Sequence, residues 1–296
     1  MREDTFSSFN PAVNFIFFIG AVVFGMFIVH PVFMVCSVVT AFAYYATVKG
    51  TGAVKLLVGI LPIFVLISLF NPLVNTRGET VLFMLGSRPY TLEALYYGMS
   101  IGGMFAGIIL WFASYSCVMT SDKFMYIFGR LIPSVSLVLT MILRLIPSFR
   151  NKTKQIAGAR MAVGKWGSSA PLKEKINDGA TILSSLTGWA LEGGIVMGDS
   201  MRSRGYGSGK RTSFSIYRFD MRDIILTAAM MLLMGFVVYC CAIGVSAAEF
   251  TPDLRIAGTE NPLFIPASAA YFLFLIIPTG TNIAEEIKWR ILRSKI

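Results

Sequence analysis

The sequence predicts an all-α, polytopic membrane protein with about six transmembrane helices and a helical cytoplasmic region. Three observations support this fold class. The chain is 55% hydrophobic and only 14% charged, which leaves too little polar surface for a soluble domain of this length. Its apolar residues fall into long uncharged runs. Its basic residues, which give a net charge of +10, gather between and after these runs rather than within them.

The spans follow from the lengths of the apolar runs, since a membrane helix needs about 20 apolar residues. The first run, from Phe15 to Val48, is uncharged and too long for one helix. Pro31 disfavours helical backbone at His30 and therefore divides it. The predicted spans are residues 13–29, 31–48, 53–74, 91–120, 224–247 and 263–280.

The charges predict that both termini lie in the cytoplasm. With the N-terminus inside, all but three of the 26 Lys and Arg residues fall on the inner side, including the tail from Lys288 to Lys295. The outer side holds only Arg77, Arg88 and Arg255. This is the distribution of a multi-pass protein of a prokaryotic cell membrane. The basic excess therefore faces the bilayer and the cytoplasm, and nothing in the chain suggests nucleic-acid binding.

Two short apolar stretches, Leu131–Leu143 and Thr181–Gly198, are predicted to lie along the inner face of the membrane rather than cross it. Crossing at the second stretch would place a strongly basic segment outside. The predicted organisation is an N-terminal membrane domain at 1–120, a helical cytoplasmic coupling-helix region without strand alternation at 121–222, and a C-terminal membrane segment with a basic tail at 223–296.

The spans lack the groups that catalysis or ion coupling requires. His30 is the only histidine and has no Cys, Asp or Glu at ligand spacing. The stretch from Gly158 to Trp166 differs from a phosphate-binding loop, because five residues separate its glycines and Trp166 replaces the Mg²⁺-binding hydroxyl. We expect no enzyme, no metal site and no cofactor. The four cysteines lie in apolar runs and are expected to be buried thiols.

Glycines predict close helix packing within the fourth span. Gly98 and Gly102 form one small-residue pair at GxxxG spacing, and Gly103 and Gly107 form another. Such pairs let helices approach closely in lipid. Packing within this chain and contact with another membrane subunit are both consistent with the spacing.

Two glycine-ended helices are predicted in the cytoplasmic region. The helix from Ala180 ends at Gly205, which places Arg204 in its last turn, where a cation complements the helix dipole. An earlier helix over Thr153–Val163 ends at Gly164. These basic tips suit docking in grooves of a partner protein. A solvated surface or a contact with anionic lipids is the alternative.

The ordered motifs resemble the transmembrane T component of energy-coupling factor (ECF) transporters, the CbiQ/EcfT family. The segment "LRLIP" at Leu143–Pro147 is similar to the family's "LRFIP" stretch, and Ser203-Arg204-Gly205 matches its second Ala-Arg-Gly motif, with Met201 and Tyr206 in register. The first motif departs from the pattern, because Ala162-Val163-Gly164 lacks the arginine and Arg160 lies about one turn upstream. Either Arg160 substitutes from this position, or the first tip binds mainly by packing.

The resemblance implies a non-catalytic scaffold that transmits the movement of two ABC-type ATPases to a substrate-binding membrane S component for vitamin or metal uptake. It implies that ATP is bound by the partner subunits. The implied ATPase-docking residues are Arg160, Ala162, Val163, Gly164, Ser203, Arg204 and Gly205. The implied S-component contacts are Leu137, Met141, Leu186, Trp189 and Gly193. The substrate stays open among riboflavin, biotin, cobalt and other solutes. A self-sufficient secondary transporter or channel is the alternative, and a membrane enzyme is the least consistent with the missing polar groups.

Overall fold

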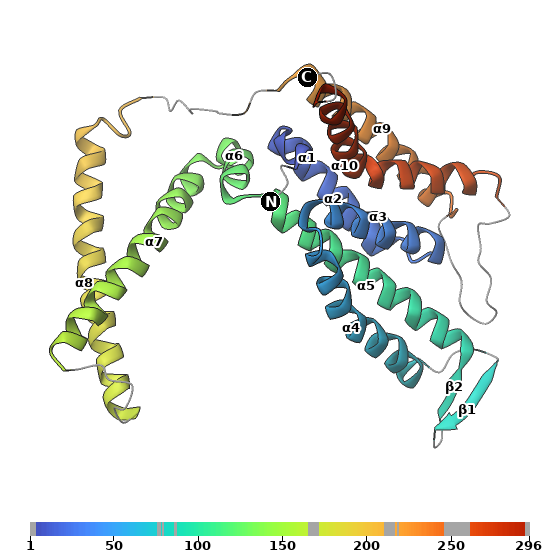
Figure 1. Cartoon of the computed structure of the whole chain (residues 1–296), viewed down its shortest axis with the longest axis horizontal. Coiled ribbons are helices and arrows are strands. Elements are labelled where there is room, and N and C mark those ends of the chain that lie inside the picture. Colours follow the sequence, from blue (N-terminus) through green and yellow to red (C-terminus); the bar gives the residue numbers. More distant parts are fainter. Residues whose placement is uncertain are drawn as a thin grey trace. The chain divides into compact units, whose positions relative to one another are not determined.

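The computed structural model of this chain describes residues 4–75, 78, 80–85, 88–164, 172–209, 217, 219–245 and 261–293. These residues form ten α-helices and one two-stranded sheet (Figure 1). They divide into unit 1, Met1–Phe124 with Tyr217–Ile296, and unit 2, Met125–Ile216. Four positions of the sequence argument lie outside the described residues: Arg77, Trp166, Arg255 and Lys295.

The helices of unit 1 confirm the predicted spans. They are α1 (Thr5–Ser8), α2 (Pro11–Phe27), α3 (Pro31–Lys49), α4 (Gly52–Val74), α5 (Leu92–Val118), α9 (Met221–Ala242) and α10 (Phe264–Arg293). Five of these, α3, α4, α5, α9 and α10, are long and apolar enough to cross a membrane, and α2 is a shorter apolar helix of 17 residues. Helix α10 continues to Arg293, well beyond the predicted end of its span at residue 280.

Proline and a polar cap begin two of the first helices. The Asn10 side chain accepts a hydrogen bond from the Ala12 amide at 3.0 Å, and Pro11 follows as the first helical residue. At α3, His30 Nδ1 accepts from the Val32 amide at 3.2 Å, and Pro31 follows. Both arrangements satisfy an amide that helix geometry leaves unpaired. The predicted break at His30 is confirmed, and its imidazole acts as a helix cap.

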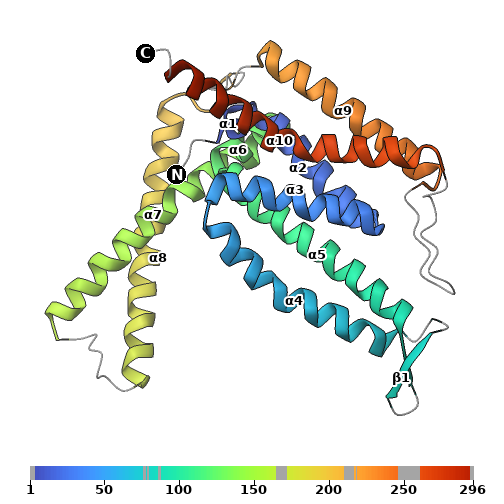
Figure 2. The same cartoon turned by 45° about the vertical axis from the view of Figure 1, so that its right-hand side comes forward.

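A β-hairpin precedes α5, and the sequence analysis did not predict it. Strand β1 (Val81–Leu85) pairs antiparallel with β2 (Arg88–Thr91), and Phe83 stacks on Tyr90 with ring centroids 4.6 Å apart. All five residues of β1 are apolar and β2 is only four residues long, so the hairpin shows no polar and apolar alternation that would have predicted it. It leads directly into α5 in Figures 1 and 2.

Helix α5 contacts α2, α3 and α4. Its two glycine pairs face different neighbours. A Cβ at Gly98 would lie 2.8 Å from a backbone oxygen of α4, and one at Gly102 would also meet α4. A Cβ at Gly103 would collide with Met34 of α3, and one at Gly107 would meet Ser37 of the same helix. Of the two alternatives left open by the sequence, the structure shows packing within this chain.

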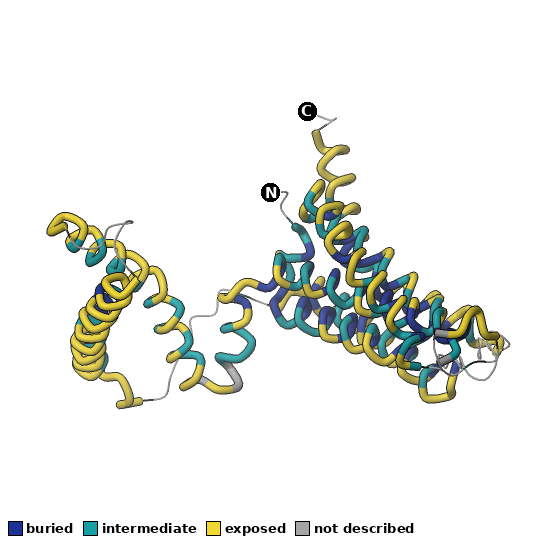
Figure 3. The backbone as a smooth tube through the Cα atoms, turned by 90° about the horizontal axis from the view of Figure 1, so that it is seen from below, coloured by how far each residue is buried: buried dark blue, intermediate teal, exposed yellow. Residues whose placement is uncertain are grey.

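Aromatic rings fill the core of unit 1. Phe17 of α2 meets Trp111 of α5 edge to face at 5.5 Å and lies 5.2 Å from Phe274 of α10. All three rings are fully buried. The indole Nε1 of Trp111 donates a 3.0 Å hydrogen bond to the Ser37 hydroxyl, which satisfies the only polar atom of that side chain. These ring contacts and the hydrogen bond to Ser37 thus join α2, α3, α5 and α10. Figure 3 colours the buried residues of the chain dark blue.

A polar network ties the N-terminal segment to α3 and α10. The Tyr44 hydroxyl donates to Asp4 Oδ2 at 2.7 Å, and Asn282 Nδ2 donates to Asp4 Oδ1 at 2.7 Å. The Phe6 amide donates to Asn282 Oδ1 at 3.1 Å. Both oxygens of the Asp4 carboxylate are therefore occupied by side chains of unit 1, and the chain start is held against two helices.

The same N-terminal segment also contacts residues close to where the chain leaves unit 1 and close to where it returns. Lys123, only 6% exposed, donates from Nζ to the Ser7 carbonyl at 2.5 Å, the Ser7 hydroxyl at 2.7 Å and the Val118 carbonyl at 3.0 Å. Just after the return to unit 1, buried Asp223 belongs to the capping box of α9, and its Oδ1 lies 3.5 Å from the Asn10 amide. Ser7 and Asn10 thus contact residues of unit 1 that precede and follow unit 2 in the sequence.

Candidate functional site

Unit 2 consists mainly of two long helices that cross each other, α7 (Pro133–Ala162) and α8 (Leu172–Ser203), with α6 (Ser121–Leu131) leading into them (Figures 1 and 2). The sequence analysis placed Leu131–Leu143 and Thr153–Val163 on separate helices. This separation is wrong, because α7 is one continuous helix from Pro133 to Ala162 and contains Pro147. The polar residues at 150–154 interrupt the apolar pattern of the sequence but do not interrupt the helical backbone. A helix outside the bilayer core tolerates such residues on its exposed side.

The second tip ends in a complete Schellman motif. The Tyr206 amide donates to the Met201 carbonyl at 3.0 Å, and the Gly205 amide donates to the Arg202 carbonyl at 3.0 Å. Gly205 has φ +78°, the left-handed conformation that this motif requires and that glycine adopts without strain. The predicted helix end is confirmed. Arg204 is the cap residue, and its side chain is exposed together with that of Ser203.

The first tip ends in a similar way. Helix α7 stops at Ala162, and Gly164 follows with φ +74° and donates its amide to the Met161 carbonyl at 3.0 Å. Val163 is 76% exposed. The predicted end at Gly164 is confirmed, and the side chains presented here are apolar.

Arg160 does not extend from this tip. Its guanidinium forms an ion pair with Asp178 of α8 through Nη2 and Oδ1. The side chains of Arg160 and Asp178 are only 18% and 11% exposed. The charge at the first tip is therefore engaged within the chain, whereas the charge at the second tip is exposed.

A single row of residues on α8 packs against α7. The row contains Asp178, Ile182, Leu186 and Trp189, and the first three are buried. Phe149 of α7 meets Trp189 edge to face at 5.5 Å, and Lys152 Nζ lies 5.8 Å from the centre of the same ring. The two helices are antiparallel, with the ion pair at one end of the contact and the aromatic pair at the other.

Apolar side chains of both helices remain exposed away from the crossing. Figure 3 draws exposed residues in yellow. These apolar side chains form two rows at helical spacing, Val135, Val138, Ile142 and Ile146 on α7, and Leu183, Leu191 and Ile195 on α8. Each of these seven side chains is at least 48% exposed. Exposed apolar rows of this length indicate a surface that another apolar surface covers.

The residues predicted to contact an S component occupy different environments. Leu186 is buried and Trp189 half-buried against α7, so the structure assigns both to the helix crossing. Leu137 and Met141 are half-buried on α7, and Gly193 is exposed on α8. The sequence analysis missed the exposed rows and Asp178. The spacing of four residues from Asp178 to Ile182, and again from Ile182 to Leu186, could have predicted that this carboxylate lies on the packed face of α8.

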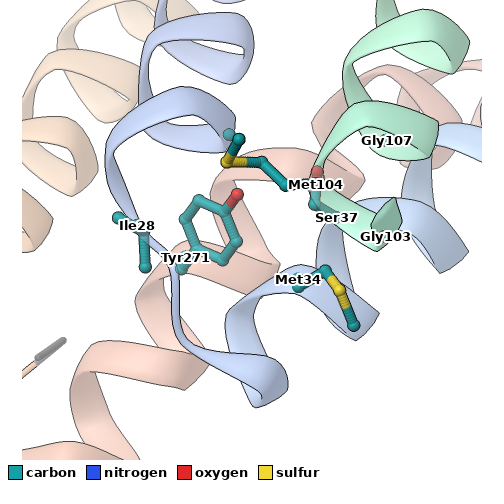
Figure 4. A pocket seen from close by; sticks show the side chains of 8 residues that line it. Ile28, Met34, Ser37, Gly103, Met104, Gly107 and Tyr271 are labelled. Atoms are coloured by element: carbon teal, nitrogen blue, oxygen red, sulfur yellow. The ribbon is translucent and has the colours of Figure 1, made fainter. Parts of the chain in front are cut away.

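A small pocket in unit 1 lies between α2, α3, α5 and α10 (Figure 4). Tyr271, Met104 and Met34 lie around it, and the Ser37 hydroxyl lies beside the two packing glycines of α5. None of its lining residues is charged. Within the described ranges, no three His, Cys, Asp or Glu side chains are grouped as metal ligands. The tips and exposed rows of unit 2 are therefore the strongest functional candidates.

Comparisons with known proteins place these features in a family context. The family model for CbiQ, described as a cobalt transport protein, matches residues 7–216. This range covers both tips and both crossing helices. An energy-coupling factor transporter transmembrane protein, EcfT, of Lactobacillus helveticus (strain DPC 4571) is 30% identical over 113 residues. That alignment covers 38% of this chain and 41% of the relative, so it spans less than half of the relative's length.

Proposed function

The chain belongs to the CbiQ family of cobalt transport proteins, and from this premise we propose that it is the transmembrane scaffold of an ECF-type importer. In this role unit 1 lies in the membrane, and unit 2 connects two cytoplasmic ATPases with a substrate-binding S component. The observation that carries the proposal is the pair of glycine-ended helix tips, one of which presents Arg204 within Ser203-Arg204-Gly205.

The second tip suits docking into a groove that offers carboxylates or carbonyl oxygens. The Schellman motif stops α8 at a defined residue, so Arg204 projects from a fixed helix end rather than from a flexible loop. A guanidinium carries five donors and stays charged at every physiological pH. Arg204 also lies at the C-terminal end of α8, where the negative end of the helix dipole stabilises a cation.

The spacing of the tips fits two separate partners. The first tip lies beside the beginning of α8, because Arg160 pairs with Asp178, and the second tip is the other end of α8. With 32 residues at about 1.5 Å each, α8 is roughly 48 Å long. A single small groove cannot hold both ends, so we assign one ATPase to each tip.

We propose that the S component rests on the exposed apolar rows of α7 and α8. Such a component is itself a membrane protein with an apolar surface, and burial of the seven exposed side chains is favourable at roughly 25 cal/mol per Å². Substrate choice, whether vitamin or metal, lies with that component. Unit 2 and both termini lie in the cytoplasm in this proposal, as the basic residues favour. ATP is bound and hydrolysed by the partner ATPases.

The test is co-purification of the two ATPases with the tagged chain in mild detergent. Removing one partner of a buried charged pair at an interface costs about 2–5 kcal/mol, and 1.4 kcal/mol is about tenfold in affinity. Arg204→Ala should therefore weaken ATPase capture by roughly 30-fold or more. Arg202→Ala is the matched control, because this arginine is exposed in the same last turn of α8. Equal capture by wild type and Arg204→Ala would refute the docking role.

A further inference from the structure

The two tips of unit 2 both end at a glycine, but they differ in how their arginine is bonded. Both carry an arginine in or near the last turn, but Arg204 is exposed while Arg160 is paired with Asp178. An arginine already bonded to a carboxylate of its own chain cannot also bind a partner's carboxylate with the same edge of its guanidinium. Arg160 Nε is buried and, within the described part of the chain, has no hydrogen-bond partner.

The location of this ion pair gives it a mechanical effect. Phe149 and Arg160 lie on one face of α7, and their partners Trp189 and Asp178 lie on one face of α8. The two contacts are 11 residues apart on each helix, which is three helical turns, or about 16 Å. Two rigid helices that touch at one point can rotate about it. A second contact three turns away fixes their crossing angle.

Packing between the two contacts is thin. Ile182 and Leu186 are the buried apolar residues that α8 contributes between them. Most other side chains of α8 are exposed. The crossing angle of α7 and α8 therefore depends strongly on the two contacts that bound this packing. The Arg160–Asp178 ion pair is the contact nearest the first tip.

We infer that Arg160 and Asp178 form a clasp that fixes the crossing angle of α7 and α8, so that both tips reach their ATPases at the same time. This inference rests on the proposed function. It makes Arg160 a positioning residue rather than a docking residue, and it leaves the first tip to bind through its apolar end, Met161 and Val163, which are 55% and 76% exposed. Two-site binding of this kind gains affinity only while the geometry allows both sites to engage.

The first experiment compares four variants by ATPase capture: Arg160→Ala, Asp178→Asn, the charge-swapped double variant Arg160→Asp with Asp178→Arg, and Arg150→Ala. Arg150 is an exposed arginine of α7 and serves as the control. We expect Arg160→Ala and Asp178→Asn each to lose about tenfold or more in capture, the charge-swapped double variant to keep most of the wild-type capture, and Arg150→Ala to match wild type. If Arg160 docks directly, Asp178→Asn keeps wild-type capture and the swap does not recover binding, which overturns the inference.

The second experiment uses the isolated chain and needs no partner. Spin labels at exposed Val163 and Leu183, in a variant whose four native cysteines are replaced, report the distance between the end of α7 and α8. We expect a narrow distance distribution that broadens in Asp178→Asn and narrows again in the swapped variant. An unchanged distribution in Asp178→Asn overturns the clasp. Failure of the wild type to capture any ATPase, with the clasp intact by this measurement, would instead contradict the proposed function.

Discussion

Lys123→Met tests whether the buried ammonium of Lys123 stabilises unit 1. The substitution keeps the length of the side chain and removes the donor of three hydrogen bonds, two to Ser7 and one to the Val118 carbonyl. The site is closed to solvent, because Lys123 is only 6% exposed. A buried acceptor that loses its partner costs about 1–3 kcal/mol.

Two backbone carbonyls lose their donor in this variant, and the Ser7 hydroxyl can turn toward another acceptor. Taking the lower part of that range for each carbonyl, the expected loss is about 2–3 kcal/mol. For a chain of this size each kcal/mol lowers the unfolding temperature by roughly 2–4 °C, so the midpoint should fall by about 4–12 °C.

The chain supplies its own reporter for this measurement. Its cysteines are free, and Cys240 is buried. A thiol-reactive fluorophore added during heating therefore reports exposure of the core. Lys154→Met is the matched control, since Lys154 is exposed on α7 and should leave the midpoint unchanged. A midpoint for Lys123→Met equal to or above that of wild type would show that the cost of burying the ammonium exceeds its hydrogen bonds, and the reasoning would be refuted.

The pH dependence provides an independent check on the same residue. Burial lowers the pKa of Lys123 from its usual value of 10.5, against the opposing effect of Asp4. The unfolded chain then binds more protons than the folded chain between the lowered pKa and 10.5, so stability should rise as the pH rises through that window. The neutral amine still donates hydrogen bonds, so this gain is separate from the loss in Lys123→Met. In that variant the rise should disappear.

Three further substitutions, with Gly235→Ala as a control, test packing and tip geometry. Gly98→Ala should destabilise the chain by about 1–3 kcal/mol, because its new Cβ meets a backbone oxygen of α4 that cannot move aside; Gly235→Ala in α9, where a Cβ meets nothing within 4 Å, should be neutral or stabilising in the same thermal assay. Trp111→Phe should cost about 1 kcal/mol or more through loss of the hydrogen bond to Ser37, and equal midpoints for variant and wild type would contradict this role. Gly205→Ala forces a side chain into a left-handed position and should weaken ATPase capture less than removal of the neighbouring arginine, with full capture counting against a fixed tip.

Much of the fold was predictable because the bilayer imposes a simple length rule. Every long uncharged run became a helix, and the break at His30 followed from the proline after it. Helix ends at Gly164 and Gly205 were equally predictable, since glycine readily adopts the left-handed backbone conformation that ends many helices. These signals are local, and local sequence is enough to read them.

The remaining features depend on contacts between distant residues. The β-hairpin before α5 is short and its first strand is entirely apolar, so it shows no strand alternation. The continuous α7 was divided in the prediction by a change in polarity that does not affect the backbone. For the site, the sequence located both tips but left the role of Arg160 open, because Asp178 lies on another helix and only the crossing brings them together. The same crossing turns Leu186 and Trp189 toward α7 and leaves a different apolar row exposed.

The polar network at the chain start has a consequence for how the protein is made. Asn282, which donates a hydrogen bond to Asp4 Oδ1, is synthesised 278 positions after Asp4. At the usual 5–20 residues per second, that interval is roughly 14–56 s. During this time Tyr44 can already donate to Asp4 Oδ2, but Oδ1 lacks its Asn282 donor because α10 does not yet exist. The contact that joins the segment at Asp4 and Phe6 to α10 can therefore form only late in synthesis, after the helices between them.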